Sequence, residues 1–183
     1  MKKRSGFTLV ELSIVLVIIG LLIGGILKGK AMIENARIKR LNNDITTITA
    51  AMYTYQDKYG ELPGDDPQGA SFQGNGNGYI EAGEQAGVWR NLIDDGLVSG
   101  DATQTTESLV AKKTPFGGYY SIRGSTSLPF YINTNGNNIA NKIIKGIDIK
   151  EDDGVYNTGD VRSNRAYSTA NNDIKSSLTW YVY

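Results

Sequence analysis

The distribution of apolar residues divides the chain into two parts. Residues 7–27 form a nearly continuous apolar run with a single charged residue, Glu11. A helix rises about 1.5 Å per residue, so this run can cross the roughly 30 Å hydrocarbon core of a membrane. Apolar residues then recur at intervals of three and four, at Ile38, Leu41, Ile45, Ile48, Met52, Tyr55 and Tyr59. This spacing predicts one helix from about Phe7 to Tyr59, amphipathic over residues 28–60.

The rest of the chain, residues 61–183, follows a different pattern. Gly60 and Pro63 end the long helix, and residues 61–87 are predicted to form a loop rich in Gly, Asn and Asp. Short helices are predicted over residues 88–93, with Gly96 as the C-terminal cap, and over residues 138–147. A Ser/Thr-rich linker is expected at residues 103–108, and strands at residues 118–123, 128–133 and 177–183.

These elements predict an α+β fold. The long N-terminal helix, membrane-spanning in its first half and amphipathic in its second, is expected to pack on a small antiparallel sheet. The chain has 183 residues with 19 basic and 19 acidic side chains, and it is slightly acidic without the three basic residues at positions 2–4. Charge therefore does not favour binding to nucleic acid. The absence of Cys and His excludes disulfides, most zinc sites and His-based catalysis.

The single carboxylate in the apolar run is the most informative residue. An acidic residue within a membrane span costs roughly 2.5 to 3.5 kcal/mol on insertion scales and normally has a partner. No basic residue lies between Phe7 and Leu27. A secretory signal peptide would carry small residues after its apolar region, where this chain has Lys28 and Lys30. The segment is therefore predicted to be a membrane anchor whose carboxylate has a function.

The residues around this carboxylate resemble a known motif. Lys2, Lys3 and Arg4 form a basic tip, and Gly6-Phe7-Thr8-Leu9-Val10-Glu11 follows. This pattern is similar to the prepilin cleavage and methylation motif of type IV pilins and of the pseudopilins of type II secretion systems. The resemblance implies a pilin-like fold with a leader at residues 1–6, an anchor at residues 7–27 and an exported globular domain at residues 61–183.

The resemblance also implies processing and partners. A prepilin peptidase and methyltransferase would cut between Gly6 and Phe7 and methylate the new Phe7 amine. Glu11 would pair with the Phe7 ammonium of a neighbouring subunit, which supplies the missing cation. The partners implied are further subunits of a helical polymer, the processing enzyme and an inner-membrane assembly platform. The precursor would be a single-pass bacterial inner-membrane protein with a cytoplasmic N-terminus and a periplasmic globular domain.

Three functions remain open at this point. The chain is expected to be a structural subunit of a type IV pilus-like filament. The alternatives are a pseudopilin that serves protein secretion, which the absence of Cys favours, and a minor pilin that captures DNA. No enzymatic activity is predicted, because the adjacent Asp pairs of the globular part lie in turn-like segments and do not define the separation that acid-base catalysis needs.

Calcium is the one cofactor for which the sequence offers ligands, and the first candidate site lies in the long loop. Residues 73–84 follow the calcium-loop template, with oxygen donors at the ligand positions, Gly78 at the bend and Ile80 after it. Gln73 replaces the usual first Asp, a loss of charge that Asp65 or Asp66 would offset. The alternative is an Asn-Gly turn without an ion. The candidate ligands are Gln73, Asn75, Asn77, Tyr79, Glu81 and Glu84.

A second candidate site is the acidic stretch that begins at Asp148. Clustered carboxylates repel one another unless they are solvated or neutralised by a cation. The stretch resembles in its chemistry the calcium-binding C-terminal loop of major pseudopilins, and the alternative is a solvated turn closed by hydrogen bonds. Its candidate ligands are Asp148, Asp152, Asp153, Asn157 and Asp160.

Overall fold

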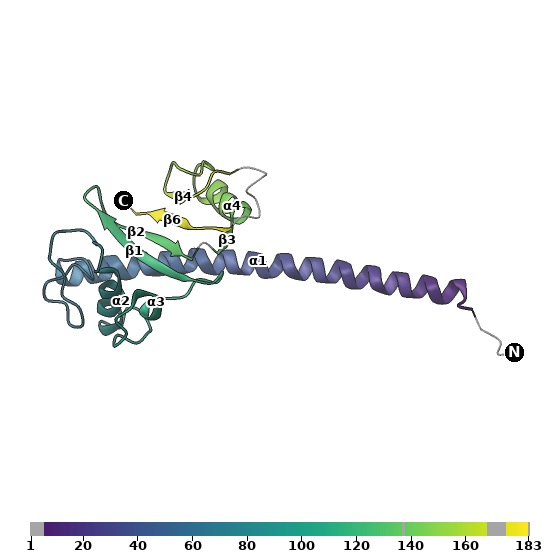
Figure 1. The fold of residues 1–183 in the computed structure, drawn as a ribbon, viewed down its shortest axis with the longest axis horizontal. Helices are drawn as coiled ribbons and strands as arrows, with labels where there is room; N and C mark the ends of the chain where they lie inside the picture. The colour runs from purple at the N-terminus through teal and green to yellow at the C-terminus, as the bar shows by residue number, and fades with distance from the viewer. Residues whose placement is uncertain (1–5, 137, 168–174, 183) are drawn as a thin grey trace. The chain divides into compact units, whose positions relative to one another are not determined.

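The computed structural model describes residues 6–136, 138–167 and 175–182. The chain divides into two compact units, Met1–Lys39 and Arg40–Tyr183, and helix α1 (Leu9–Tyr59) contributes to both (Figure 1). The helix begins two residues later than predicted and ends at the predicted residue. Gly60 follows it with φ of 80°, the left-handed conformation that terminates helices.

In the first unit α1 exposes its apolar side chains. Among the described residues α1 is the one helix long and apolar enough to cross a membrane. The large apolar side chains from Leu9 to Leu27 are exposed along this stretch. Such a surface requires lipid or other apolar helices around it.

In the second unit α1 buries one face. Leu41, Ile45, Ile48, Met52 and Tyr55 of the predicted stripe are buried. The prediction is wrong for Tyr59, which is 47% exposed. Its ring packs on Tyr55 and its hydroxyl donates a hydrogen bond to Asp95 at 2.7 Å, so a polar contact takes the place of burial.

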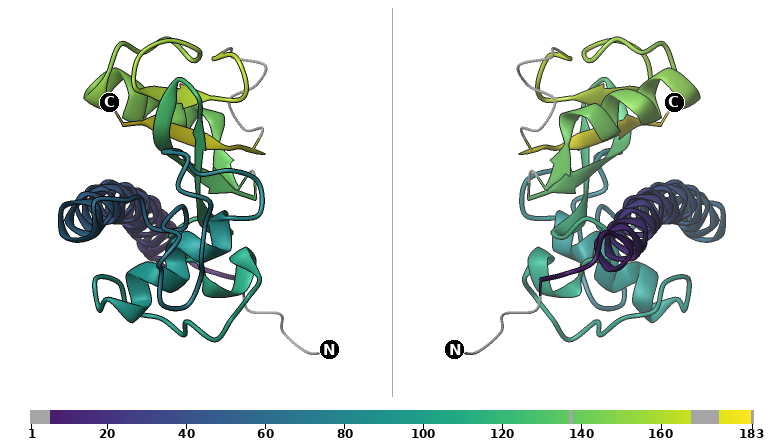
Figure 2. Two further views of the ribbon diagram at one scale, coloured as in Figure 1. Left: turned by 90° about the vertical axis from the view of Figure 1, so that its left-hand side faces the viewer. Right: turned by 90° about the vertical axis from the view of Figure 1, so that its right-hand side faces the viewer.

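An antiparallel sheet lies over this part of α1 (Figures 1 and 2). Its strand order is β1-β2-β6-β4, in which every neighbouring pair is antiparallel. The three predicted strands are present, although Tyr183 lies outside the described residues. The strands are β1 (Tyr119–Ser125), β2 (Leu128–Asn135), β4 (Val161–Ser163) and β6 (Leu178–Tyr181). A separate pair consists of β3 (Ile139–Ala140) and β5 (Lys175–Ser176).

Short helices lie next to both edge strands of the sheet. Helix α2 (Gln85–Asp94) contains the predicted segment and is capped at Gly96, with φ of 73°, whereas α3 (Glu107–Val110) forms partly within the expected linker. Helix α4 (Asn141–Glu151) begins and ends later than predicted. Ile139 lies in β3 and pairs with Ser176 of β5. Because strand pairing uses its backbone groups, Ile139 does not belong to the helix. Helix α2 contacts β1, and α4 contacts β4.

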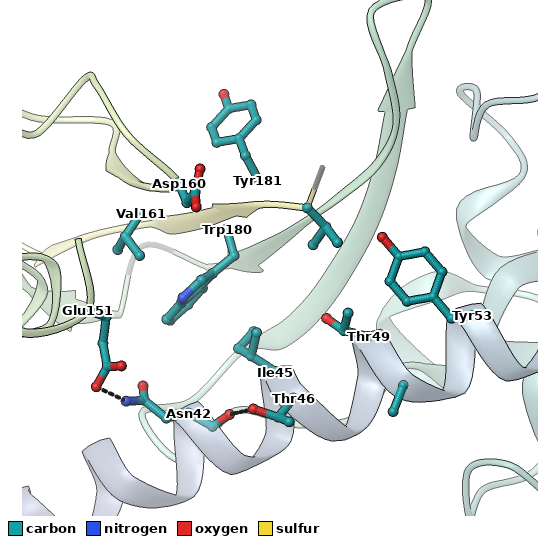
Figure 3. Close-up of a pocket in the computed structure, with 12 residues that line it drawn as sticks. Asn42, Ile45, Thr46, Thr49, Tyr53, Glu151, Asp160, Val161, Trp180 and Tyr181 are labelled. Atoms are coloured by element: carbon teal, nitrogen blue, oxygen red, sulfur yellow. Dashed lines mark hydrogen bonds between the residues drawn. The ribbon is translucent and has the colours of Figure 1, made fainter. Parts of the chain in front are cut away.

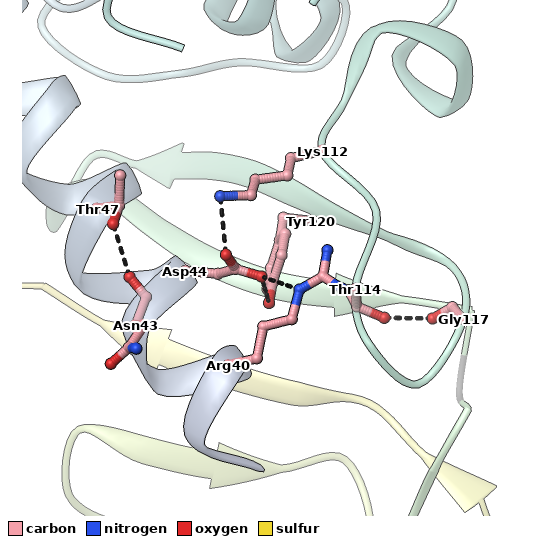
Figure 4. A network of polar contacts seen from close by, with 8 residues as sticks. All are labelled: Arg40, Asn43, Asp44, Thr47, Lys112, Thr114, Gly117 and Tyr120. Atoms are coloured by element: carbon pink, nitrogen blue, oxygen red, sulfur yellow. Dashed lines mark hydrogen bonds and ion pairs between the residues drawn. The ribbon is translucent and has the colours of Figure 1, made fainter. Parts of the chain in front are cut away.

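A buried carboxylate joins α1 to the sheet (Figure 4). Asp44 accepts a hydrogen bond from the Tyr120 hydroxyl of β1 at 3.1 Å. It also forms an ion pair with the Lys112 Nζ at 2.8 Å. Arg40 lies 3.8 Å from the same carboxylate. Burial, together with the charge of Asp44, raises the pKa of Tyr120. Because a buried charge without partners is costly, these contacts fix where the sheet meets the helix.

Candidate functional site

The predicted processing site lies immediately before α1. Gly6 and Phe7 are exposed, with Phe7 91% exposed, and neither belongs to the helix. An accessible segment outside regular secondary structure is the form of chain that a peptidase can bind. The basic tip at residues 2–4 lies outside the described residues.

Glu11 forms hydrogen bonds within the start of its own helix. Its Oε2 accepts hydrogen bonds from the backbone N–H and the hydroxyl of Thr8, both at 2.8 Å. The Glu11 N–H donates in return to the Thr8 hydroxyl at 3.2 Å. This reciprocal pair is a capping box, which satisfies backbone donors that the first turn of a helix leaves free. Thr8 was not among the predicted functional residues, although the Thr-x-x-Glu spacing from Thr8 to Glu11 indicates this cap.

The long loop is organised around Asp65, which is fully buried. Its carboxylate accepts hydrogen bonds from the backbone N–H groups of Gly76 at 2.8 Å, Asn77 at 3.1 Å and Gly78 at 2.6 Å. Convergent N–H groups of this kind favour negative charge. The loop therefore surrounds a carboxylate of the chain itself, whereas Asp65 was predicted only as an additional cation ligand.

The other candidate ligands of this loop already serve as acceptors or lie at the surface. The side-chain oxygens of Asn75 and Asn77 accept from the N–H groups two residues ahead, and Glu81 accepts from the Asn75 amide at 2.9 Å. Glu84 is buried and accepts from the Glu81 N–H at 2.8 Å. Gln73 is exposed and Tyr79 half-buried. Calcium binding by this loop remains a prediction.

Three carboxylates of the second candidate site come together at the end of α4. One oxygen each of Asp148, Asp152 and Asp153 lies within 4.8 Å of the other two. Calcium binds oxygens at about 2.3–2.6 Å, so oxygens on opposite sides of one ion are about this far apart. Hydrogen bonds from the loop that follows hold the three side chains in place. The Gly154 N–H donates to Asp148 and the Val155 N–H to Asp153. The Val161 N–H donates to Asp152.

Asp148 is fully buried, and the donor available to it besides the loop backbone is the Tyr167 hydroxyl. Apart from Tyr167, its Oδ2 has no hydrogen-bond partner in the described part of the chain. Burial, together with the charges of Asp153 and Asp152, raises the pKa of Asp148, whereas the contacts with Tyr167 and the Gly154 N–H lower it. A cation bound here would offset the repulsion among the three carboxylates. Asn157 and Asp160 are exposed, and Asp160 is not in the group of three.

Comparison with known proteins identifies the same motif at the N-terminus. Residues 1–27 match the family model described as the prokaryotic N-terminal methylation motif. No curated protein and no solved structure matches the chain.

The matched motif and the fold agree with each other. The chain carries the N-terminal signature of type IV pilins and pseudopilins, and a long helix with an apolar stretch precedes a small antiparallel sheet in a pilin-like α+β fold. This signature belongs to prepilins that are methylated and anchored by a transmembrane helix, and it points to a structural subunit. The motif fits a precursor anchored in the inner membrane.

Proposed function

We propose that the chain is a structural subunit of a helical filament of the type IV pilus class. The methylation motif at the start of α1 carries this proposal, together with the exposed apolar surface of residues 9–27. In the precursor that surface lies in lipid. In the filament it lies among the α1 helices of neighbouring subunits, which replace lipid with equally apolar contacts.

Processing prepares the helix start for assembly. Cleavage between Gly6 and Phe7 leaves an ammonium group four residues before Glu11. The Glu11 carboxylate caps its own helix in the free subunit and pairs with the Phe7 ammonium of a neighbour in the filament. Because an unpaired charge in an apolar core is costly, this pair sets the register of an incoming subunit.

Substitution of Glu11 tests this mechanism and separates its two roles. Gln is accepted at this position of a capping box but carries no charge, whereas Ala removes both properties. We expect Glu11→Ala and Glu11→Gln chains to be cleaved at Gly6 yet to enter filaments poorly. Cleavage and methylation are read by mass spectrometry and assembly by the polymer recovered after shearing. Normal assembly of Glu11→Gln would show that capping, and not the charge pair, is what matters.

A pseudopilin of a type II secretion system is the alternative, and the carboxylate group at the end of α4 favours it. Shearing cells at native expression distinguishes the two. Abundant chain beginning at N-methyl-Phe7 in the extracellular fraction supports a surface pilus. Mature chain confined to the envelope, with loss of secreted proteins when the gene is deleted, supports the pseudopilus. Unprocessed chain in both fractions would contradict both functions.

We also propose that Asp148, Asp152 and Asp153 bind calcium. The ion would supply positive charge that holds three carboxylates and the following loop together. The support is the spacing of the oxygens and the buried Asp148 Oδ2, which has no hydrogen-bond partner other than the Tyr167 hydroxyl. This proposal is independent of the kind of filament that the chain forms.

Thermal unfolding of a soluble fragment beginning at Ala31, with calcium or with chelator, tests the site. We expect chelator to lower the melting temperature, since an ion that binds only the folded state stabilises it. Asp148→Asn should abolish the difference, whereas Glu84→Ala should leave it intact. If Glu84→Ala abolishes the difference and Asp148→Asn leaves it intact, the calcium site lies in the Asn-Gly loop instead. Equal melting curves of the unaltered fragment in both conditions would rule out calcium at either loop.

A further inference from the structure

The second unit contains an open groove between α1 and the sheet, with a volume of about 620 Å³ (Figure 3). One wall is formed by α1 from Asn42 to Tyr53, and the other by β6, the start of β4 and the end of α4. Trp180 points from β6 toward α1, and the buried side chains of Ile45, Val161 and Trp180 form the apolar floor of the groove.

The charged residues that line the groove are all acidic. They are Glu151 and Asp160, and no basic residue of the described chain lines the groove. Glu151 accepts a hydrogen bond from Asn42 at 3.0 Å and pairs with Lys150 at 2.8 Å, outside the lining. The Asp160 carboxylate is exposed and has no ion pair or hydrogen bond with the described residues. The groove thus combines an apolar floor with an unpaired negative charge.

The first unit carries a surface of complementary chemistry. Met32, Ala36 and Lys39 follow one another at helical spacing, and Ile33 and Arg37 form a neighbouring row. Met32 is 65% and Ile33 59% exposed, and both lie beyond the apolar run at residues 7–27. Arg37 and Lys39 are exposed and have no ion pair in the described part of the chain. We call residues 32–39, which hold Arg37, Lys39 and one half-buried acidic residue, Glu34, the basic segment.

We propose that the groove of one subunit receives the basic segment of a second copy of the chain. Met32 and Ile33 would cover the apolar floor, while Arg37 and Lys39 would face Asp160 and Glu151. The two surfaces match in charge, and Asp160, Arg37 and Lys39 are all exposed in the single subunit. This inference rests on the proposed function, because only a polymer presents the α1 helix of one copy to the globular part of another.

The physical role of this contact is to add specificity to apolar packing. Apolar helix surfaces alone allow many registers, because one aliphatic side chain packs much like another. A charge pair at one position suppresses the alternatives in which like charges meet or the carboxylate stays unpaired. The contact lies outside the membrane-spanning run, so it is sensitive to salt.

Disulfide cross-linking in the full-length chain tests the contact directly, because the chain has no cysteine of its own. Ala36→Cys in the basic segment is combined with Thr46→Cys in the groove. The matched control is Ala36→Cys with Thr47→Cys, since Thr46 and Thr47 are both exposed and each bonds the carbonyl four residues earlier. Thr47 does not line this groove. Each single variant is oxidised in parallel.

We expect the Ala36/Thr46 pair to give a band at twice the subunit mass and a ladder above it, several-fold stronger than the control pair. Equal cross-linking of both pairs, or a band of another mass, would overturn the inference. If N-methylated chain is recovered as polymer while the Ala36/Thr46 pair stays monomeric, the inference fails and the proposed function stands. If neither polymer nor cross-link is found, both fail.

Charge reversal provides a second, independent test in the full-length chain. Asp160→Lys should lower the recovered polymer about two- to fivefold, the range expected for an exposed ion pair. Adding Arg37→Glu should restore it. Asp57→Lys, which reverses an exposed charge that does not line the groove, should have no such effect. A double variant no better than Asp160→Lys alone would contradict the pairing.

Discussion

At the scale of single residues, buried carboxylates organise the globular part, and each has a different environment. Asp44 faces side-chain donors, Asp65 faces backbone N–H groups, and Asp148 lies beside two further carboxylates with only the Tyr167 hydroxyl near its Oδ2. An anion surrounded by donors is already satisfied, whereas the repulsion between neighbouring carboxylates is relieved by water, a proton or a cation. This contrast is why calcium is proposed at Asp148 and not at the loop around Asp65.

The role of Asp65 leads to a prediction for stability. Asp65→Asn should lower the free energy of unfolding by about 2 kcal/mol, since hydrogen bonds to a charged acceptor are lost and an amide N–H₂ is brought against backbone donors. Urea unfolding of the fragment beginning at Ala31 measures it. Asp57→Asn removes a charge from the exposed side of α1 and should change stability little. An equal effect of the two substitutions would show that Asp65 does not organise the loop.

At the scale of elements, the end of α1 is attached to the end of α2. Lys58 donates a hydrogen bond to Asp95, and the Tyr59 hydroxyl donates to the same oxygen. Both hydrogen bonds lower the pKa of Asp95, and the one from Lys58 has the larger effect. A carboxylate whose pKa is lowered by folding stabilises the folded state at pH values above its ordinary pKa of about 3.9. This stability is lost as the pH falls through the lowered pKa.

Asp95→Asn should therefore lower the melting temperature at neutral pH and have a smaller effect in acid. We expect a constant difference from unaltered protein between about pH 7 and pH 5 that shrinks below about pH 4. The adjacent, exposed Asp94 provides the control, because it makes no ion pair in the described residues and Asp94→Asn should show no such trend. A difference that is independent of pH would mean that the charge of Asp95 does not contribute.

At the scale of the whole molecule, the buried core and the apolar run at residues 7–27 are separate parts of one chain. The buried apolar residues of the described chain begin at Leu41 and continue to Trp180. The membrane-spanning run contributes none of them. Folding of the globular part therefore does not need the apolar surface of residues 9–27.

Removing residues 1–30 should consequently leave the globular part folded. We expect a soluble monomer that unfolds cooperatively, with a midpoint within about 4 °C of the full-length chain in detergent. A fragment beginning at Thr46 loses Leu41, Asp44 and Ile45 and should unfold at a much lower temperature or fail to fold. Size-exclusion chromatography and circular dichroism measure both. Aggregation of the longer fragment would show that the anchor takes part in folding.

The features that sequence determined are local. The apolar run, the spacing from Leu41 to Tyr55 and the motif from Gly6 to Glu11 depend on neighbours within one or two helical turns. The helix, its end at Tyr59 and the motif were therefore predictable. The fold class followed from the same periodicities, and the three longer strands were found because each carries its own alternating pattern.

Only the tertiary structure decided which distant groups meet. Asp44 and Tyr120 are 76 residues apart, and Lys58 and Asp95 are 37 apart. The short elements β4 and α3 have too few residues to show a periodicity, and their neighbours hold them in place. The same reason explains Asp65 and Asp148: the sequence shows carboxylates in both loops, but only folding brings backbone donors to one and further carboxylates to the other.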